Sequence, residues 1–90
     1  MAQSKEDAYN KARSDLARRL VVEEDQIQGS AEDAEFPDGA LGAPVKGEMS
    51  AQMITSGWRI NLKAGGQNYE YRADKRQVRL YNYKGSNYRV

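Results

Sequence analysis

The most restrictive feature of this chain is a pair of alternating segments joined by two glycines. Apolar side chains occupy every second position of residues 58–64, WRINLKA, and tyrosines alternate in residues 67–73, QNYEYRA. A period of two is typical of strands that bury one face, and Gly65-Gly66 between them is a strong signal for a β-hairpin. This half of the chain is expected to form an antiparallel sheet. The apolar residues expected on its inner face are Trp58, Ile60, Leu62, Tyr69, Tyr71, Val78 and Leu80.

The N-terminal region has a helical period instead. Apolar residues recur every four positions from Ala8 to Leu20, which predicts one narrow apolar stripe along a helix. Ser4 is a residue type favoured at helix N-caps, and acidic residues follow it in the first turn, where the helix dipole favours them. We expect one amphipathic helix over residues 5–21.

Three more segments are expected to be strands, separated by turns at residues 55–57 and 74–76. The expected strands are residues 26–36, 49–54, 58–64, 67–73 and 77–83. The predicted fold class is α+β, with one N-terminal helix packed on a four- to five-stranded antiparallel sheet, as in the cystatin and monellin layout. Residues 1–90 are expected to form a single domain.

Residues 36–47, FPDGALGAPVKG, contain both prolines and three of the eight glycines. The segment is too long for a hairpin turn, and long loops in compact domains are often functional. Two interpretations are open. In the first, proline and glycine fix one shape at low entropy cost and Leu41 closes the open end of the core. In the second, the loop is a preformed contact surface through which Asp38 and Leu41 meet a partner.

Five short motifs occur in order along the chain. They are ARSDLARRL (12–20), FPDGALGAP (36–44), GWRINL (57–62), YEY (69–71) and VRLY (78–81). With these motifs the chain resembles a group of short, largely uncharacterised bacterial proteins. Their pattern is A-x-x-D-L-A-x-R-L, W-P-D-x-x-L-G-C-P, G-[YW]-x-I-x-L, Y-x-Y and V-x-L-C. The resemblance supports the fold more than a function.

This chain departs from that pattern at three positions. Phe36 replaces the tryptophan, and the two cysteines of the pattern fall at Ala43 and Tyr81. Their joint absence is expected if they pair in the relatives, so the resemblance implies a loop pinned to the last strand. Other contacts must hold the loop here. The absence also indicates either a reducing compartment or removal of the cysteines by engineering.

Cysteine and histidine are both absent from the chain. Their absence removes thiol nucleophiles, disulfides, the commonest general base and the commonest transition-metal ligand. The carboxylates of Glu32, Asp33, Glu35 and Asp38 lie in an acidic stretch with no nucleophile or phosphate-binding loop nearby. We therefore expect no enzymatic activity, no cofactor and no metal site.

The first twenty residues contain no apolar segment of the signal-peptide type, and no apolar run in the sequence is long enough to span a membrane. We expect a cytoplasmic protein that does not bind membranes. Relatives that keep the cysteines are expected to include exported proteins.

The leading functional hypothesis is a non-enzymatic protein-binding module that contacts its partner through loop 36–47 and a hairpin at residues 52–58. The cystatin-like layout raises the possibility of a peptidase partner, because inhibitors of that fold class insert a Q-x-V-x-G hairpin loop. Residues 52–57, QMITSG, partly match that motif, although an ordinary hairpin explains them as well. The expected contact residues are Asp38, Leu41, Gln52, Met53, Gly57 and Trp58.

The alternative hypothesis is nucleic-acid or polyanion binding through the outer face of the sheet. Residues 1–56 carry six Lys/Arg and eleven Asp/Glu, a net charge of −5, and residues 57–90 carry eight and two, a net charge of +6. Such asymmetry indicates an anion-binding half, or two halves that neutralise each other in the fold. The expected anion-binding residues are Arg59, Lys63, Arg72 and Arg79. The chain is expected to be a monomer, or a weak dimer through an edge strand.

Overall fold

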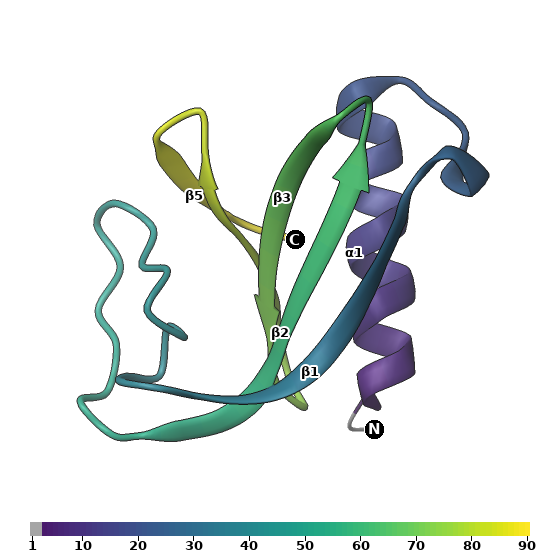
Figure 1. Cartoon of the computed structure of the whole chain (residues 1–90). Coiled ribbons are helices and arrows are strands. Elements are labelled where there is room, and N and C mark those ends of the chain that lie inside the picture. The colour runs from purple at the N-terminus through teal and green to yellow at the C-terminus, as the bar shows by residue number, and fades with distance from the viewer. Residues whose placement is uncertain (1–2) are drawn as a thin grey trace.

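One α-helix, one short 3₁₀ helix and five antiparallel strands make up the computed structural model, which describes residues 3–90 (Figure 1). The elements are α1 (Lys5–Leu20), a short 3₁₀ helix η1 (Glu24–Gln26), β1 (Gln28–Phe36), β2 (Thr55–Ala64), β3 (Gln67–Ala73), β4 (Val78–Tyr83) and β5 (Ser86–Arg89). The strands lie in the order β1-β2-β3-β4-β5, and each pairs with its neighbours in antiparallel fashion. The α+β class and the helix-on-sheet layout expected from sequence are confirmed.

The helix begins at a capping box and ends one residue earlier than expected. The Ser4 hydroxyl oxygen accepts a hydrogen bond from the Asp7 backbone N–H, and the Asp7 carboxylate accepts one from the Ser4 backbone N–H, both at 3.1 Å. Val21 adopts the left-handed conformation, with φ 56°, and therefore terminates α1 at Leu20.

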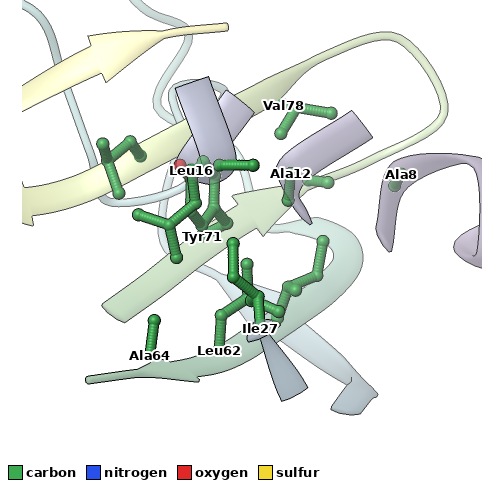
Figure 2. Packing of buried hydrophobic residues seen from close by; sticks show 12 residues of the cluster. Ala8, Ala12, Leu16, Ile27, Leu62, Ala64, Tyr71 and Val78 are labelled. Atoms are coloured by element: carbon green, nitrogen blue, oxygen red, sulfur yellow. The ribbon is translucent and has the colours of Figure 1, made fainter. Parts of the chain in front are cut away.

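The core lies between the apolar stripe of α1 and one face of the sheet (Figure 2). Ala8, Ala12 and Leu16 are fully buried on the helix, and the two alanines allow α1 to approach the strands closely. Figure 2 shows them beside side chains that come from the strands and from the segment before β1. These residues are Ile27, Leu62, Ala64, Tyr71 and Val78. Trp58, expected in the core, is only half-buried at its margin.

One polar network is buried beside this core. The Tyr71 hydroxyl donates a hydrogen bond to the Asp15 carboxylate at 2.8 Å, and Arg19 donates to the same carboxylate at 2.7 Å. Burial, together with the neighbouring Asp15 carboxylate, raises the pKa of Tyr71 well above its usual range. The guanidinium of Arg19 also lies over the rings of Tyr83 and Tyr88. The network therefore ties α1 to the strands, and among residues 3–90 no buried side-chain nitrogen or oxygen lacks a hydrogen-bond partner.

The expected strand at residues 49–54 and the expected turn at residues 55–57 are both wrong. Residues 49–54 have no strand structure, and β2 starts at Thr55. The reason is the length of β1, which pairs with β2 without interruption from Gln28 opposite Lys63 to Phe36 opposite Thr55. Gly57 is therefore a residue inside a strand.

Gly57 is required in β2 because the backbone of a neighbouring strand lies close to it. A Cβ atom at this position would stand 2.1 Å from the backbone oxygen of Ala73, far inside van der Waals contact. A Cβ atom at Gly39, in contrast, would meet nothing closer than 3.5 Å.

We predict that Gly57→Ala lowers the free energy of unfolding by about 1–3 kcal/mol, because β2 and β3 must separate to admit the methyl group. Gly39→Ala is the matched control and should change it little. Urea unfolding followed by circular dichroism measures both. Equal stability of the two variants would contradict the placement of Gly57 inside β2.

Candidate functional site

Four arginines stand side by side on the outer face of the sheet, the face turned away from α1. Arg59 on β2 is directly opposite Arg72 on β3, which is opposite Arg79 on β4, which is opposite Arg89 on β5. We call these four residues the arginine row. Like charges directly opposite one another destabilise a sheet, so the row can form only where other groups compensate for the repulsion.

Three glutamates offset most of the positive charge of the arginine row. Glu48 forms two hydrogen bonds with Arg79, at 2.6 and 2.8 Å, and its carboxylate lies 3.5 Å from Arg89. Glu70 accepts a hydrogen bond from Nε of Arg72 at 2.6 Å and lies 3.4 Å from Arg59. Glu32 on β1 adds a longer contact of 3.9 Å to Arg59.

Two aromatic rings stabilise the centre of the arginine row. The guanidinium of Arg72 lies over the ring of Tyr81, 3.7 Å from its centroid. Phe36 is buried at the end of β1, and its ring centroid lies 5.5 Å from the guanidinium of Arg72 and 5.9 Å from that of Arg59. Cation–π contacts of this kind are favourable, and more so where water is excluded.

Residues 37–54, which connect β1 to β2, cover part of the outer face, and we call them the covering loop. In Figure 1 this loop (teal) lies on the side of the strands away from α1. Ala40, Leu41 and Ala43 of this loop are buried, as is Phe36 at the end of β1, and none of these four belongs to the helix-side core. The sheet therefore has a second, smaller apolar cluster on its outer face.

Side chains from the C-terminal part of the chain pin the covering loop through its backbone oxygens. Arg72 donates to the Leu41 carbonyl at 3.0 Å, and Arg79 donates to the Ala43 carbonyl at 3.2 Å. Two further side chain–carbonyl bonds are Gln77 to Gly39 and Asn87 to Pro44, both at 2.9 Å. These bonds connect the loop to the end of the sheet formed by β3, β4 and β5, without any cysteine.

The arginines expected to bind anions have different environments in the structure. Arg72 and Arg79 are only 14% and 6% exposed, and both are committed to glutamates and loop carbonyls. Arg59 is partly exposed, and Lys63 is exposed further along β2. The four residues therefore share one face of the sheet but do not form an open basic surface.

Two of the expected partner contacts shape the covering loop instead. The Asp38 carboxylate accepts hydrogen bonds from the backbone N–H groups of Ala40 and Gly42, at 2.9 and 3.0 Å. Leu41 is completely buried, with φ 60°. The expectation that Leu41 meets a partner is therefore corrected, because its side chain is not accessible. Leu41 also does not close the helix-side core, since it packs on the opposite face of the sheet.

The returning arm of the covering loop exposes large apolar side chains. Met49, Met53 and Ile54 are 96%, 61% and 72% exposed, and we call these three residues the apolar rim. They line a shallow groove with Gly39, Ala51, Ser56 and Gln77. Gln52, an expected contact, is exposed on the same arm.

Met49 and Ile54 are not among the residues expected from sequence at this surface. The apolar character of residues 49–54 is visible in the sequence, but it is equally typical of a buried strand. Only the unbroken pairing of β1 with β2 up to Thr55 leaves this segment outside the sheet.

Gly57 and Trp58, the two remaining expected contacts, lie at a neighbouring groove. Its lining includes Asp33, Glu35 and Lys75, and it shares Ser56 with the groove beside the apolar rim. Because Thr55–Gly57 belong to β2, the structure has no hairpin at residues 52–58. The partial Q-x-V-x-G match therefore does not correspond to a projecting loop.

Residues 3–90 contain no group of three or more acidic side chains placed to hold a metal ion. In the same part of the chain, no helix is long and apolar enough to cross a membrane.

The fold and this surface define a small α+β domain whose sheet is covered by a helix on one face and by a pinned loop on the other. The family model described as "Domain of unknown function (DUF8738)" matches residues 9–81, and the chain belongs to this family. No curated protein and no solved structure matches the chain.

The contact between Glu48 and Arg79 should make stability depend on acid pH. Hydrogen bonds from Arg79 lower the pKa of Glu48 from its ordinary 4.5 to about 2, with smaller contributions from the Val45 N–H and from Arg89. A depressed carboxyl pKa stabilises the fold above the unfolded-state pKa, and this stabilisation is lost as the pH falls from about 4.5 to about 2.

We predict that Glu48→Gln lowers the free energy of unfolding at pH 7 and flattens its decline between pH 4.5 and pH 2. Urea unfolding of the wild type and the variant across this pH range provides the measurement. If the free energy of unfolding declined in parallel for the two proteins, protonation of Glu48 would not be the cause of the loss of stability in acid.

Proposed function

We propose that this protein is a non-enzymatic protein-binding module that presents the apolar rim to its partner. The observation that carries the proposal is the exposure of Met49, Met53 and Ile54 within six residues of one loop. Exposed apolar patches on small proteins mark interaction surfaces. Methionine is also over-used at binding surfaces, because its flexible side chain adapts to the shape of a partner.

The attachment of the covering loop supports the same proposal. Hydrogen bonds to the carbonyls of Gly39, Leu41, Ala43 and Pro44 hold the outgoing part of the loop. Glu48, immediately before the rim, is held by Arg79. A surface whose shape is fixed before binding loses less conformational entropy on association. The rim is therefore suited to a partner with a complementary apolar pocket.

A peptidase partner has less support. The single helix against an antiparallel sheet suits a cystatin-like or monellin-like layout, but residues 55–57 lie inside β2 and leave no wedge-shaped hairpin. We therefore propose a partner defined by an apolar pocket rather than by a protease cleft.

Polyanion binding is the alternative. The basic side chains on the outer face that are exposed enough to contact a polyanion are Arg59, Lys63 and Arg89. Ionic strength separates the two proposals, because phosphate contacts weaken steeply with salt, whereas apolar burial does not.

We predict that replacing Met49, Met53 and Ile54 together by serine lowers the amount of partner captured from lysate of the producing cells by about tenfold or more. Val21→Ser is the matched control, because Val21 is an exposed apolar residue outside the rim. Quantitative mass spectrometry of proteins captured in 0.15 M and 0.5 M salt provides the measurement.

Wild type and Val21→Ser should capture the same protein at both salt concentrations. The proposal fails if the triple serine variant captures that protein equally well, or if only nucleic acid is retained and is released by salt.

A further inference from the structure

β1 is an edge strand with one side unpaired. Within the described residues it pairs only with β2, and its nine residues do so in unbroken register (Figure 1). The other edge strand, β5, is only four residues long, and its pairing with β4 is irregular. An unpaired strand edge carries free N–H and C=O groups that can bind another extended chain.

Several devices that usually protect an edge strand are missing from β1. Its register with β2 contains no bulge, and the nearest proline, Pro37, follows the strand instead of interrupting it. The protection that remains is charge. Glu32, Asp33 and Glu35 are all exposed on β1, and they would repel a second copy of the same strand.

A groove runs between α1 and the free edge of β1. Lys5, Glu6 and Tyr9 line it from the helix, and Gly29, Ser30 and Ala31 line it from the strand. Ala31 is opposite Ile60 on the helix side of the sheet and packs against the core. A strand added along β1 would point every second side chain into this groove, because successive side chains alternate between the two faces.

The charge on β1 selects the kind of strand that can be added. Asp33 is 84% exposed although it pairs with Lys5 at 3.0 Å, and Glu32 is 60% exposed beside Arg59 at 3.9 Å. Glu35 makes no ion pair within residues 3–90. Lysine or arginine side chains on an incoming strand would find accessible carboxylates on both faces of β1.

We propose that β1 binds an extended, basic segment of another protein as a sixth strand of the sheet. Backbone hydrogen bonds to the free edge supply affinity, as in other complexes formed by strand addition. Apolar side chains of the segment fill the groove beside Tyr9 and Ala31, and its basic side chains meet Glu32, Asp33 and Glu35. This surface is separate from the apolar rim and does not depend on the function proposed for it.

The test uses the full chain and a fluorescent heptapeptide, Lys-Thr-Lys-Lys-Val-Thr-Val, which in antiparallel pairing places its valines beside Gly29 and Ala31 and its lysines beside Glu32, Asp33 and Glu35. The control peptide has the same sequence with N-methyl groups on alternate residues along one edge, which keeps its charge but removes its hydrogen-bond donors. Fluorescence anisotropy should show binding of the first peptide and at least about tenfold weaker binding of the second, because strand addition depends on main-chain hydrogen bonds.

Two charge-reversal variants of the protein complete the experiment. Glu35→Lys should weaken binding by about threefold or more, as expected for the loss of exposed ionic contacts. Glu23→Lys makes the same change of charge before β1 and should have a smaller effect. Backbone NMR shifts on adding the peptide should concentrate in residues 28–36. The triple serine variant of the apolar rim should bind the peptide like the wild type.

The proposal is overturned by any of four results. These are no binding of the unmodified peptide, equal binding of both peptides, equal effects of the two charge reversals, and sedimentation showing that β1 is already paired with a second copy of the chain.

Discussion

The repulsion within the arginine row is the constraint on which the rest of the structure depends. Four guanidinium groups can stand side by side on adjacent strands only if acids, aromatic rings and carbonyl oxygens surround them. The covering loop supplies several of these groups, including the Glu48 carboxylate and the carbonyls of Leu41 and Ala43. The loop and the row therefore depend on each other: the arginines fix the shape of the loop, and the loop offsets part of the charge of the arginines.

Because of this dependence, the two faces of the sheet are held by different kinds of interaction. Apolar burial against α1 holds one face, and charge-assisted hydrogen bonds to the covering loop hold much of the other. The same dependence also brings the two oppositely charged halves of the sequence together, because Glu32 and Glu48 from the acidic half meet arginines of the basic half. The Met49, Met53 and Ile54 side chains take part in neither interaction and remain exposed to solvent.

Local sequence patterns predicted the elements whose periodicity is strong. The helix, the hairpin at Gly65-Gly66 and the outward direction of Arg59, Arg72 and Arg79 all follow from which side chains can share a face. Residues 49–57 could not be predicted in this way. Their structure depends on the length of β1, whose weak alternation gives no register with β2. Pairing between arginines distant in sequence is likewise a property of register, so neither the arginine row nor the face of the sheet on which Leu41 is buried was visible in the sequence.

Hydrogen exchange in an Arg79→Lys variant tests the central claim most directly. Lysine keeps the charge but cannot form the two parallel bonds that arginine makes with Glu48. The account predicts that the amides of Gly39, Leu41 and Ala43, which are hydrogen-bonded within the covering loop, exchange about tenfold faster or more, while amides of Ile60 and Tyr71 keep their wild-type rates. Unchanged exchange in the loop, or equal acceleration at all five amides, would contradict the claim that Arg79 holds the loop in place.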